Sequence, residues 1–204
     1  MFDTLPMGSM TWTAETVLVA DDDGDMRSLY QCWLAAFDEV RTAADGDDAL
    51  GRLDKDVDVV LLDREMPRTD GVAVARELDR CDLDPTVVMI SGVRPDVDLL
   101  DIPVDDYLQK PVSGETVRGR VRRAMAVAEQ PRPRRHLLSL DSRRRIVEAA
   151  TSRRALTADP TYQRVVDVLD RHTDTVRSAR HAVAVERHEF ARRTAPDHSL
   201  PESP

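Results

Sequence analysis

The segment at residues 57–63 is short, rich in valine and leucine, and ends in the carboxylate of Asp63. An apolar run of this length is typical of a strand that is buried on both faces of a parallel sheet. Pro67 and the Asp70-Gly71 pair predict a loop that leads into a helix. A lone acid at this position would most simply cap that helix. However, open α/β sheets bind ligands at the carboxyl ends of their strands, so the other strand ends decide the matter.

Four further apolar runs alternate with helical patterns on both sides of this segment. The predicted strands are residues 16–20, 40–44, 57–63, 86–90 and 106–109. The predicted helices are residues 25–37, 47–53, 71–80, a weak segment at 96–100, and 113–128. Strict alternation of strands and helices predicts an α/β domain with a parallel sheet covered on both faces. Right-handed crossovers then place the carboxyl ends of all strands along one edge.

Polar side chains follow the strands at that edge. Asp21 and Asp22 follow the first strand, Asp63 ends the third, Ser91 follows the fourth and Lys110 follows the fifth. Three converging carboxylates are not comfortably ionised together without a cation, and hard oxygen donors favour Mg²⁺. Because an aspartate can act as a nucleophile, the sequence predicts a phosphoryl group on Asp63, with its charge offset by the metal, Lys110 and Ser91.

Several short motifs stand in a fixed order along the chain. They are VLVADD at 17–22, LLDREMP at 61–67, DG at 70–71, SG at 91–92 and DYLQKP at 106–111. Together they resemble the receiver domain of two-component response regulators over about residues 15–128. The resemblance implies a flavodoxin-like (βα)5 receiver whose five-stranded parallel sheet has the order 2-1-3-4-5. It also implies a signalling protein rather than a classical enzyme, which catalyses its own phosphorylation and dephosphorylation and has a sensor histidine kinase as its partner.

The same resemblance assigns the acidic site. It implies that Asp63 is the phosphoacceptor. It also implies that Asp22 ligates Mg²⁺ directly, Asp21 ligates it through water, and Asp63 and the backbone carbonyl of Glu65 complete the metal site. The position of Arg27 identifies Asp21 and Asp22 as the acidic pair.

The remaining site residues are Ser91, Lys110 and Tyr107. By resemblance, Ser91 and Lys110 stabilise the phosphoryl group, and Ser91 and Tyr107 form a switch in which Tyr107 moves from an exposed to a buried rotamer. A competing interpretation is that Tyr107 only packs at the edge strand. Ser91 and Lys110 are 19 positions apart, a few fewer than is usual in the family, which predicts a short or poorly formed helix between the fourth and fifth strands.

The C-terminal part is predicted to be helical. Its two expected helices, residues 139–156 and 160–193, form a hairpin behind a stiff basic linker at residues 130–136. Apolar residues recur every seven positions from Tyr162 to Phe190, which is a coiled-coil-like seam. Together with Leu156 and Tyr162, the stretch SRRRIVEAA at 142–150 resembles the HalX domain that follows receivers in haloarchaea.

The sequence therefore predicts five segments. They are a disordered leader at 1–13, the receiver at 14–129, the linker at 130–136, the HalX-like helical domain at 137–193 and a disordered tail at 194–204. Residues 131–204 hold 15 basic and 10 acidic residues, whereas the preceding part holds 14 basic and 28 acidic ones. Lys55 and Lys110 are the only lysines, and this Asp-rich, Lys-poor usage indicates a halophilic archaeon.

The output of the helical part is open between two classes. The favoured interpretation is a protein interaction or self-association through the seam. The alternative is a DNA-binding transcriptional regulator controlled by receiver phosphorylation, although no recognition helix accompanies the arginines. A phosphatase-type hydrolase is less favoured, because no insertion is long enough to form a cap over a substrate. No apolar run approaches the length needed to cross a bilayer, so a cytoplasmic protein without membrane contact is expected.

Overall fold

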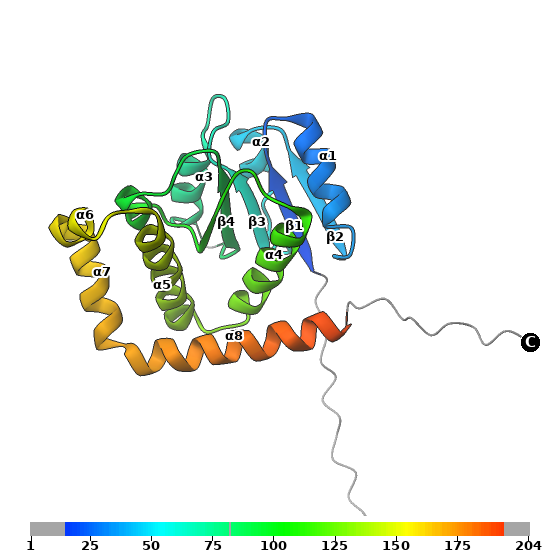
Figure 1. The fold of residues 1–204 in the computed structure, drawn as a ribbon. Coiled ribbons are helices and arrows are strands. Elements are labelled where there is room, and N and C mark those ends of the chain that lie inside the picture. Colours follow the sequence, from blue (N-terminus) through cyan, green and yellow to red (C-terminus); the bar gives the residue numbers. More distant parts are fainter. Residues whose placement is uncertain (1–14, 82, 194–204) are drawn as a thin grey trace, which may run out of the picture.

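The computed structural model describes residues 15–81 and 83–193, with side chains as far as residue 186. It consists of an α/β domain and a set of C-terminal helices that pack against this domain (Figure 1). The leader expected at residues 1–13 and the tail expected at 194–204 lie outside the described residues.

The α/β domain contains one parallel sheet of five strands in the order β2-β1-β3-β4-β5. The strands are β1 (Thr16–Ala20), β2 (Glu39–Ala43), β3 (Val59–Asp63), β4 (Thr86–Ser91) and β5 (Asp106–Gln109). Every residue of β1, β3 and β4 is buried, as their continuous apolar sequences predict. The expected fold class and strand order are confirmed.

Helices cover both faces of the sheet. They are α1 (Gly24–Trp33), α2 (Gly46–Gly51), α3 (Gly71–Leu78) and α4 (Gly114–Ala128), with a 3₁₀ helix η1 (Val97–Asp101) between β4 and β5. Buried residues of α1 share an apolar cluster with most of those of α4, and buried residues of α2 and α3 belong to a second cluster. Aspartate or serine side chains accept backbone N–H groups at the starts of these helices, because short polar side chains satisfy the free donors there. The weak helical segment expected near 96–100 is the 3₁₀ helix η1.

Gly71 allows α3 to begin directly against the end of β3. A Cβ atom at this position would lie 2.1 Å from the backbone oxygen of Asp63, which is far inside van der Waals contact. The preceding residue, Asp70, caps α3 by accepting the N–H of Ala73 at 2.7 Å. The Asp70-Gly71 pair therefore fixes the helix start beside the strand end that carries Asp63.

The described C-terminal residues, up to 193, form four helices instead of the expected hairpin. They are α5 (Arg132–Ala150), α6 (Arg153–Ala158), α7 (Pro160–Arg171) and α8 (Thr173–Arg193). The prediction of a linker at 130–136 is wrong, since α5 already begins at Arg132. Prolines fit here because the first turn of a helix needs no N–H donor from them. The long helix expected from residue 160 ends at Arg171, and His172 separates it from α8.

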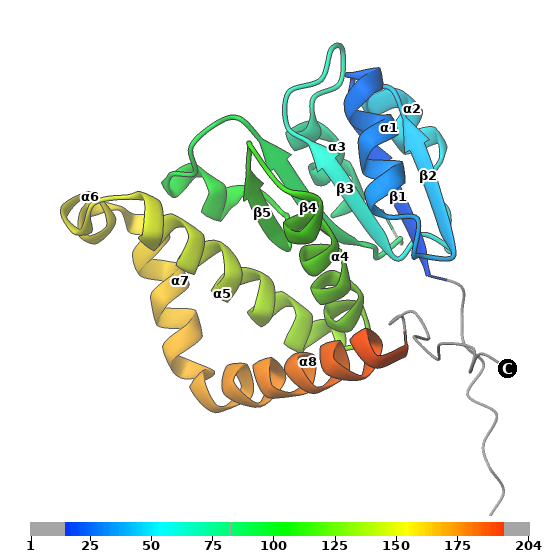
Figure 2. The same ribbon diagram turned by 45° about the vertical axis from the view of Figure 1, so that its right-hand side comes forward.

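The seven-residue seam faces the inside of the molecule. Leu169, Val176 and Val183 are buried, and Tyr162 is half-buried. The helix α8 passes across α4 and α5, while α7 lies against α5 and η1 (Figures 1 and 2). The side chain of Phe190, the last expected seam residue, lies beyond the described side chains. No helix in the described part of the chain is both long and apolar enough to span a membrane.

The carboxylate of Asp141 joins α5 to α8. Its side chain is only 3% exposed and accepts two N–H groups of Arg180, one of them at 2.7 Å. Arg144 donates a further hydrogen bond at 3.1 Å, and Arg145 lies 3.6 Å away. Burial alone would raise the pKa of Asp141, but these arginines hold it below its ordinary value. The ionised carboxylate is therefore a structural centre of the C-terminal helices.

We expect Asp141→Asn to destabilise the folded chain, because it leaves several arginines around a neutral amide. Removing one partner of a buried ion pair costs several kcal/mol, and the partial exposure of these arginines reduces this to about 2 kcal/mol. Denaturant unfolding at neutral pH measures the loss. The matched control is Asp174→Asn, since the Asp174 side chain is 94% exposed and pairs with Arg177 on the surface of α8. An equal change in both variants would contradict the structural role of Asp141.

The pH dependence has a definite sign. A carboxylate whose pKa is lowered in the folded state stabilises it above the unfolded pKa, and this contribution is lost as pH falls through the folded pKa. The difference in unfolding free energy between wild type and Asp141→Asn should therefore shrink as the pH falls below about 4, the ordinary pKa of aspartate.

Candidate functional site

Three aspartates meet at the carboxyl edge of the sheet. Asp21 follows β1 and Asp63 ends β3, and carboxylate oxygens of Asp21, Asp22 and Asp63 lie within 4.8 Å of one another. Asp21 and Asp63 are buried, whereas Asp22 is exposed. The structure thus brings together the three acids that the sequence places at the same edge.

Hydrogen bonds fix the turn that carries the acidic pair. The Oδ1 atom of Asp21 accepts the N–H of Asp23 at 2.9 Å, and Nη1 of Arg27 donates to the backbone oxygen of Asp21 at 2.7 Å. Asp23 itself accepts the N–H groups of Asp25 and Met26 and so caps α1. Asp23 therefore serves the helix, which agrees with its expected place outside the acidic pair.

Lys110 lies between two of the carboxylates. Its Nζ atom is 3.2 Å from Oδ2 of Asp21 and 3.2 Å from Oδ1 of Asp63. Burial would lower the pKa of Lys110, but the two carboxylates raise it above its ordinary value. Burial also raises the pKa of Asp63, although the Lys110 ammonium opposes this effect. Lys110 thus pairs with two of the three carboxylates in the cluster, which leaves the site able to accept a further cation.

The donor set fits Mg²⁺. This ion prefers hard oxygen ligands and binds through few carboxylates, because it keeps several waters and shares phosphate oxygens. Asp21, Asp22 and Asp63 provide such oxygens around one point. The side chain of Glu65 is exposed and passes near Gly92, with Oε2 3.9 Å from where a Cβ of Gly92 would lie. The role of the Glu65 carbonyl as a further ligand stays a prediction.

Ser91 and Tyr107 are both connected to Val93. The hydroxyl of Ser91, which is fully buried, accepts the N–H of Val93 at 3.0 Å. The hydroxyl of Tyr107 donates to the carbonyl of Val93 at 2.5 Å, and the Tyr107 side chain is 3% exposed. The exposed starting rotamer expected for Tyr107 is therefore not the one observed, because Val93 supplies a partner that holds the ring inward.

Tyr30 is a residue of this region that the sequence did not reveal. It is buried in α1, packs edge-to-face on Trp33 at 5.6 Å, and has no hydrogen-bond partner for its hydroxyl among the described residues. Burial raises the pKa of Tyr30 to about 12, with Lys110 opposing and the nearby aspartates adding to this shift. It lies in the helix expected at residues 25–37, and no local signal marks its hydroxyl.

Comparisons with known proteins identify the family to which this site and fold are similar. A family model described as the response regulator receiver domain matches residues 17–122. The chain is similar to a putative transcriptional regulator of Haloferax volcanii, with 46% identity over 105 residues that cover 51% of this chain and 18% of that protein. It is also similar to the transcriptional regulatory protein CpxR of Klebsiella pneumoniae, with 35% identity over 111 residues that cover 52% of this chain and 47% of that protein.

The fold is also similar to a solved receiver structure. The BeF3-activated DrrB receiver domain superposes with a TM-score of 0.51 at 25% identity, over 55% of this chain and 97% of that chain. The chain spans half or less of the length of the curated relatives named above. Because the family model matches more than half of the residues, the chain belongs to the response regulator receiver family, with its receiver domain at residues 17–122.

Proposed function

We propose that this chain is a response regulator of a two-component phosphorelay and that Asp63 accepts a phosphoryl group from a histidine kinase. The observation that carries the proposal is the position of Lys110, whose ammonium lies 3.2 Å from both Asp21 and Asp63 within the acidic cluster. Asp21, Asp22 and Asp63 would hold Mg²⁺, and Glu65 would add its backbone carbonyl.

The transfer is a substitution at phosphorus. A carboxylate oxygen of Asp63 forms the new P–O bond, the P–N bond to the donor histidine breaks, and its electron pair stays on the imidazole nitrogen. The product is an acyl phosphate on Asp63. Lys110 would offset charge on the transferred oxygens, because it already lies 3.2 Å from Oδ1 of Asp63. Mg²⁺ held by Asp21, Asp22 and Asp63 would supply further positive charge.

The acceptor assignment is tested with Asp63→Asn. In Mg²⁺ and a small phosphodonor such as acetyl phosphate, we expect wild type to take up a single phosphoryl group per chain and Asp63→Asn to take up none. Intact-protein mass spectrometry measures the added mass. Asp98→Asn is the control, because Asp98 is an exposed acid of η1 that should label like wild type. Equal labelling of Asp63→Asn and wild type would refute the assignment, and repeated turnover of a phosphate ester would instead indicate a hydrolase.

Ser91 would sense the phosphoryl group. Its hydroxyl can donate to a phosphoryl oxygen on Asp63, since β3 and β4 are neighbours and Asp63 pairs with Ile90, the residue before Ser91. Lys110 would act from the other side, and Tyr107 would follow the Ser91 movement through Val93. Tyr107 starts this movement from a buried rotamer and not from an exposed one.

We expect Ser91→Ala to weaken the binding of beryllofluoride, a phosphoryl mimic. A hydrogen bond to a charged group is worth about 1.5–3 kcal/mol, which corresponds to a loss of about tenfold or more. Fluorine NMR titration in Mg²⁺ measures the affinity. Ser28→Ala is the control, because its hydroxyl donates only to the Gly24 carbonyl on exposed α1. Wild-type affinity in Ser91→Ala would remove Ser91 from the site.

The output of the helices is proposed to be a protein interaction or self-association, with residues 137–193 as a HalX-like domain. Support comes from the apolar seam, because salt does not weaken apolar contacts. A second candidate is DNA binding, which the name of the Haloferax relative favours. The halophilic host that the composition indicates fits this archaeal relative.

The two proposed outputs predict different oligomeric states of the phosphorylated chain. Since Leu169, Val176 and Val183 are buried within the chain, we expect a monomer without beryllofluoride and a larger species with it. Size-exclusion chromatography with light scattering measures the mass, and a pull-down from genomic DNA runs in parallel. Enrichment of specific promoters by a chain that stays monomeric throughout would favour the DNA-binding candidate.

A further inference from the structure

We propose that Arg94 links the phosphoacceptor site to the C-terminal helices, and that a phosphoryl group on Asp63 loosens the end of α5 together with α6 and α7. The inference rests on the proposed function, because it needs a phosphoryl group at Asp63. It adds the route by which that group would change the rest of this chain.

The segment that follows β4 touches both the site and the helices. Val93 donates its N–H to Ser91 and accepts the hydroxyl of Tyr107. The next residue, Arg94, donates from its guanidinium to the carbonyl of Ala150, which is the last residue of α5. Carbonyls in the final turn of a helix have no partner within that helix, so this donor satisfies one of them. One short loop therefore connects the buried hydroxyl of Ser91 to the end of α5.

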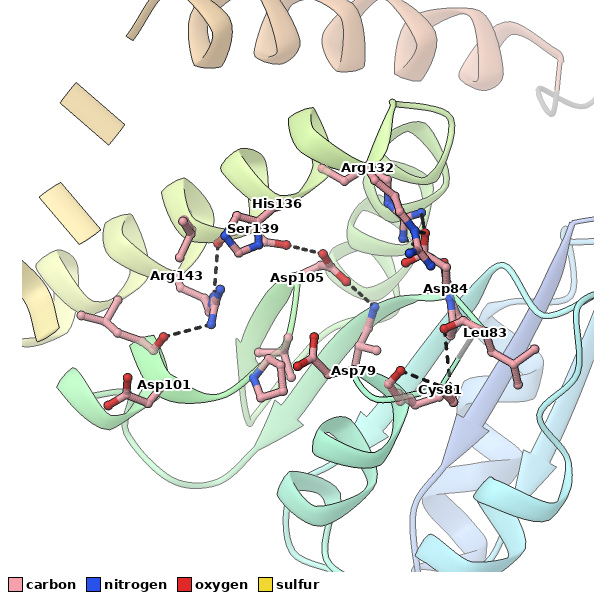
Figure 3. A pocket seen from close by; sticks show the side chains of 18 residues that line it. Asp79, Cys81, Leu83, Asp84, Asp101, Asp105, Arg132, His136, Ser139 and Arg143 are labelled. Atoms are coloured by element: carbon pink, nitrogen blue, oxygen red, sulfur yellow. Dashed lines mark hydrogen bonds and ion pairs between the residues drawn. The ribbon is translucent and has the colours of Figure 1, made fainter. Parts of the chain in front are cut away.

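A second arginine binds the same part of the receiver. Arg143 of α5 is 6% exposed and points toward the receiver (Figure 3). Its guanidinium donates to the carbonyl of Leu100 at 3.0 Å and to that of Ile102. Arg143 and Ala150 are seven residues apart, which corresponds to about two turns of helix. The C-terminal half of α5 is thus bound to the receiver at two points, Arg143 and Ala150.

The N-terminal half of α5 is anchored differently. Arg135 pairs with Asp84 at 2.7 Å, and the hydroxyl of Ser139 donates to Asp105. These partners lie at the amino ends of β4 and β5, away from the strand ends that carry the acidic site (Figure 3). A displacement that begins at Ser91 therefore reaches the end of α5 and leaves its beginning attached.

The contact between α5 and the receiver combines buried apolar side chains of α5, such as Val147, with an open polar pocket. A cavity of about 580 Å³ forms this pocket, with Asp101 and Asp105 on the receiver side and Arg132 and Arg143 on the α5 side (Figure 3). Charged groups around a cavity can exchange partners with water at little cost, whereas close-packed apolar side chains cannot. The polar part of this interface therefore permits a local rearrangement, while its apolar part stays packed.

The direction of the change follows from the hydrogen bonds. A phosphoryl group adds acceptor oxygens beside β4, and a turn of the Ser91 side chain toward them draws along Val93, because the Ser91 oxygen can donate to the phosphoryl group and still accept the Val93 N–H. Val93 and Arg94 then move together, because they are consecutive residues of a loop. The bond from Arg94 to Ala150 is exposed, and an exposed hydrogen bond is readily lost to water. The end of α5 and the helices that follow it become less protected.

Hydrogen–deuterium exchange of the full chain tests the inference. Without beryllofluoride, Arg94→Ala should raise the exchange rates of amides in residues 146–171 several-fold, and Arg94→Lys should restore part of the protection. Beryllofluoride in Mg²⁺ should raise exchange in the same segment of wild type. The matched control is Arg80→Ala, since Arg80 is an exposed arginine that pairs only with Glu77 on α3.

Two results would overturn the inference. One is equal exchange of residues 146–171 in Arg94→Ala and Arg80→Ala. The other is unchanged or slower exchange of this segment in wild type once fluorine NMR shows that beryllofluoride is bound. Failure of beryllofluoride to bind would overturn the proposed function and its control of the helices. In that case the Arg94→Ala comparison would still decide whether this contact holds the end of α5.

Discussion

The ion pairs of Lys110 with Asp21 and Asp63 hold the ends of three strands at one point. They join the residue after β5 to the residue after β1 and to the last residue of β3. Without the ammonium, three carboxylates would repel one another at a largely buried edge. The strands of the sheet thus hold the backbone in place, and the ion pairs determine where the side chains at the strand ends lie. The chemistry proposed for Asp63 depends on that arrangement, because an incoming phosphoryl group finds its counter-charges already positioned.

The sequence predicted the α/β part well because its signals are local. Buried strands read as continuous apolar runs, and each strand end carries its own polar residue. The C-terminal part depended on signals that local patterns do not contain. Pro131 and Pro133 predict a linker, although the first turn of a helix tolerates them. The helix break at His172 depends on backbone geometry that residue spacing cannot specify. The inward position of Tyr107 depends on a hydrogen bond to Val93, which the sequence pattern does not reveal.

The seam shows how one pattern can serve two purposes. Apolar residues every seven positions are typical of helices that associate with another chain. In this molecule Leu169, Val176 and Val183 instead pack within the chain, and Asp141 fastens α5 to α8 beside them. Burial in the folded chain and contact with a second copy are mutually exclusive for these residues. Any association through them therefore requires that the helices first separate from the receiver.

Because α5 covers η1 and β5, another protein needs a minimum affinity to bind to that surface. A helix tethered to the surface it covers competes with a free molecule as if it were present at a concentration on the order of millimolar. A partner that recognises the surface around Leu100 and Ile102 must displace Arg143 before it can bind. Weakly binding proteins are therefore excluded by a segment of the chain itself. A small loss of attachment at one end of α5 would then change which proteins in the cell can compete for this surface.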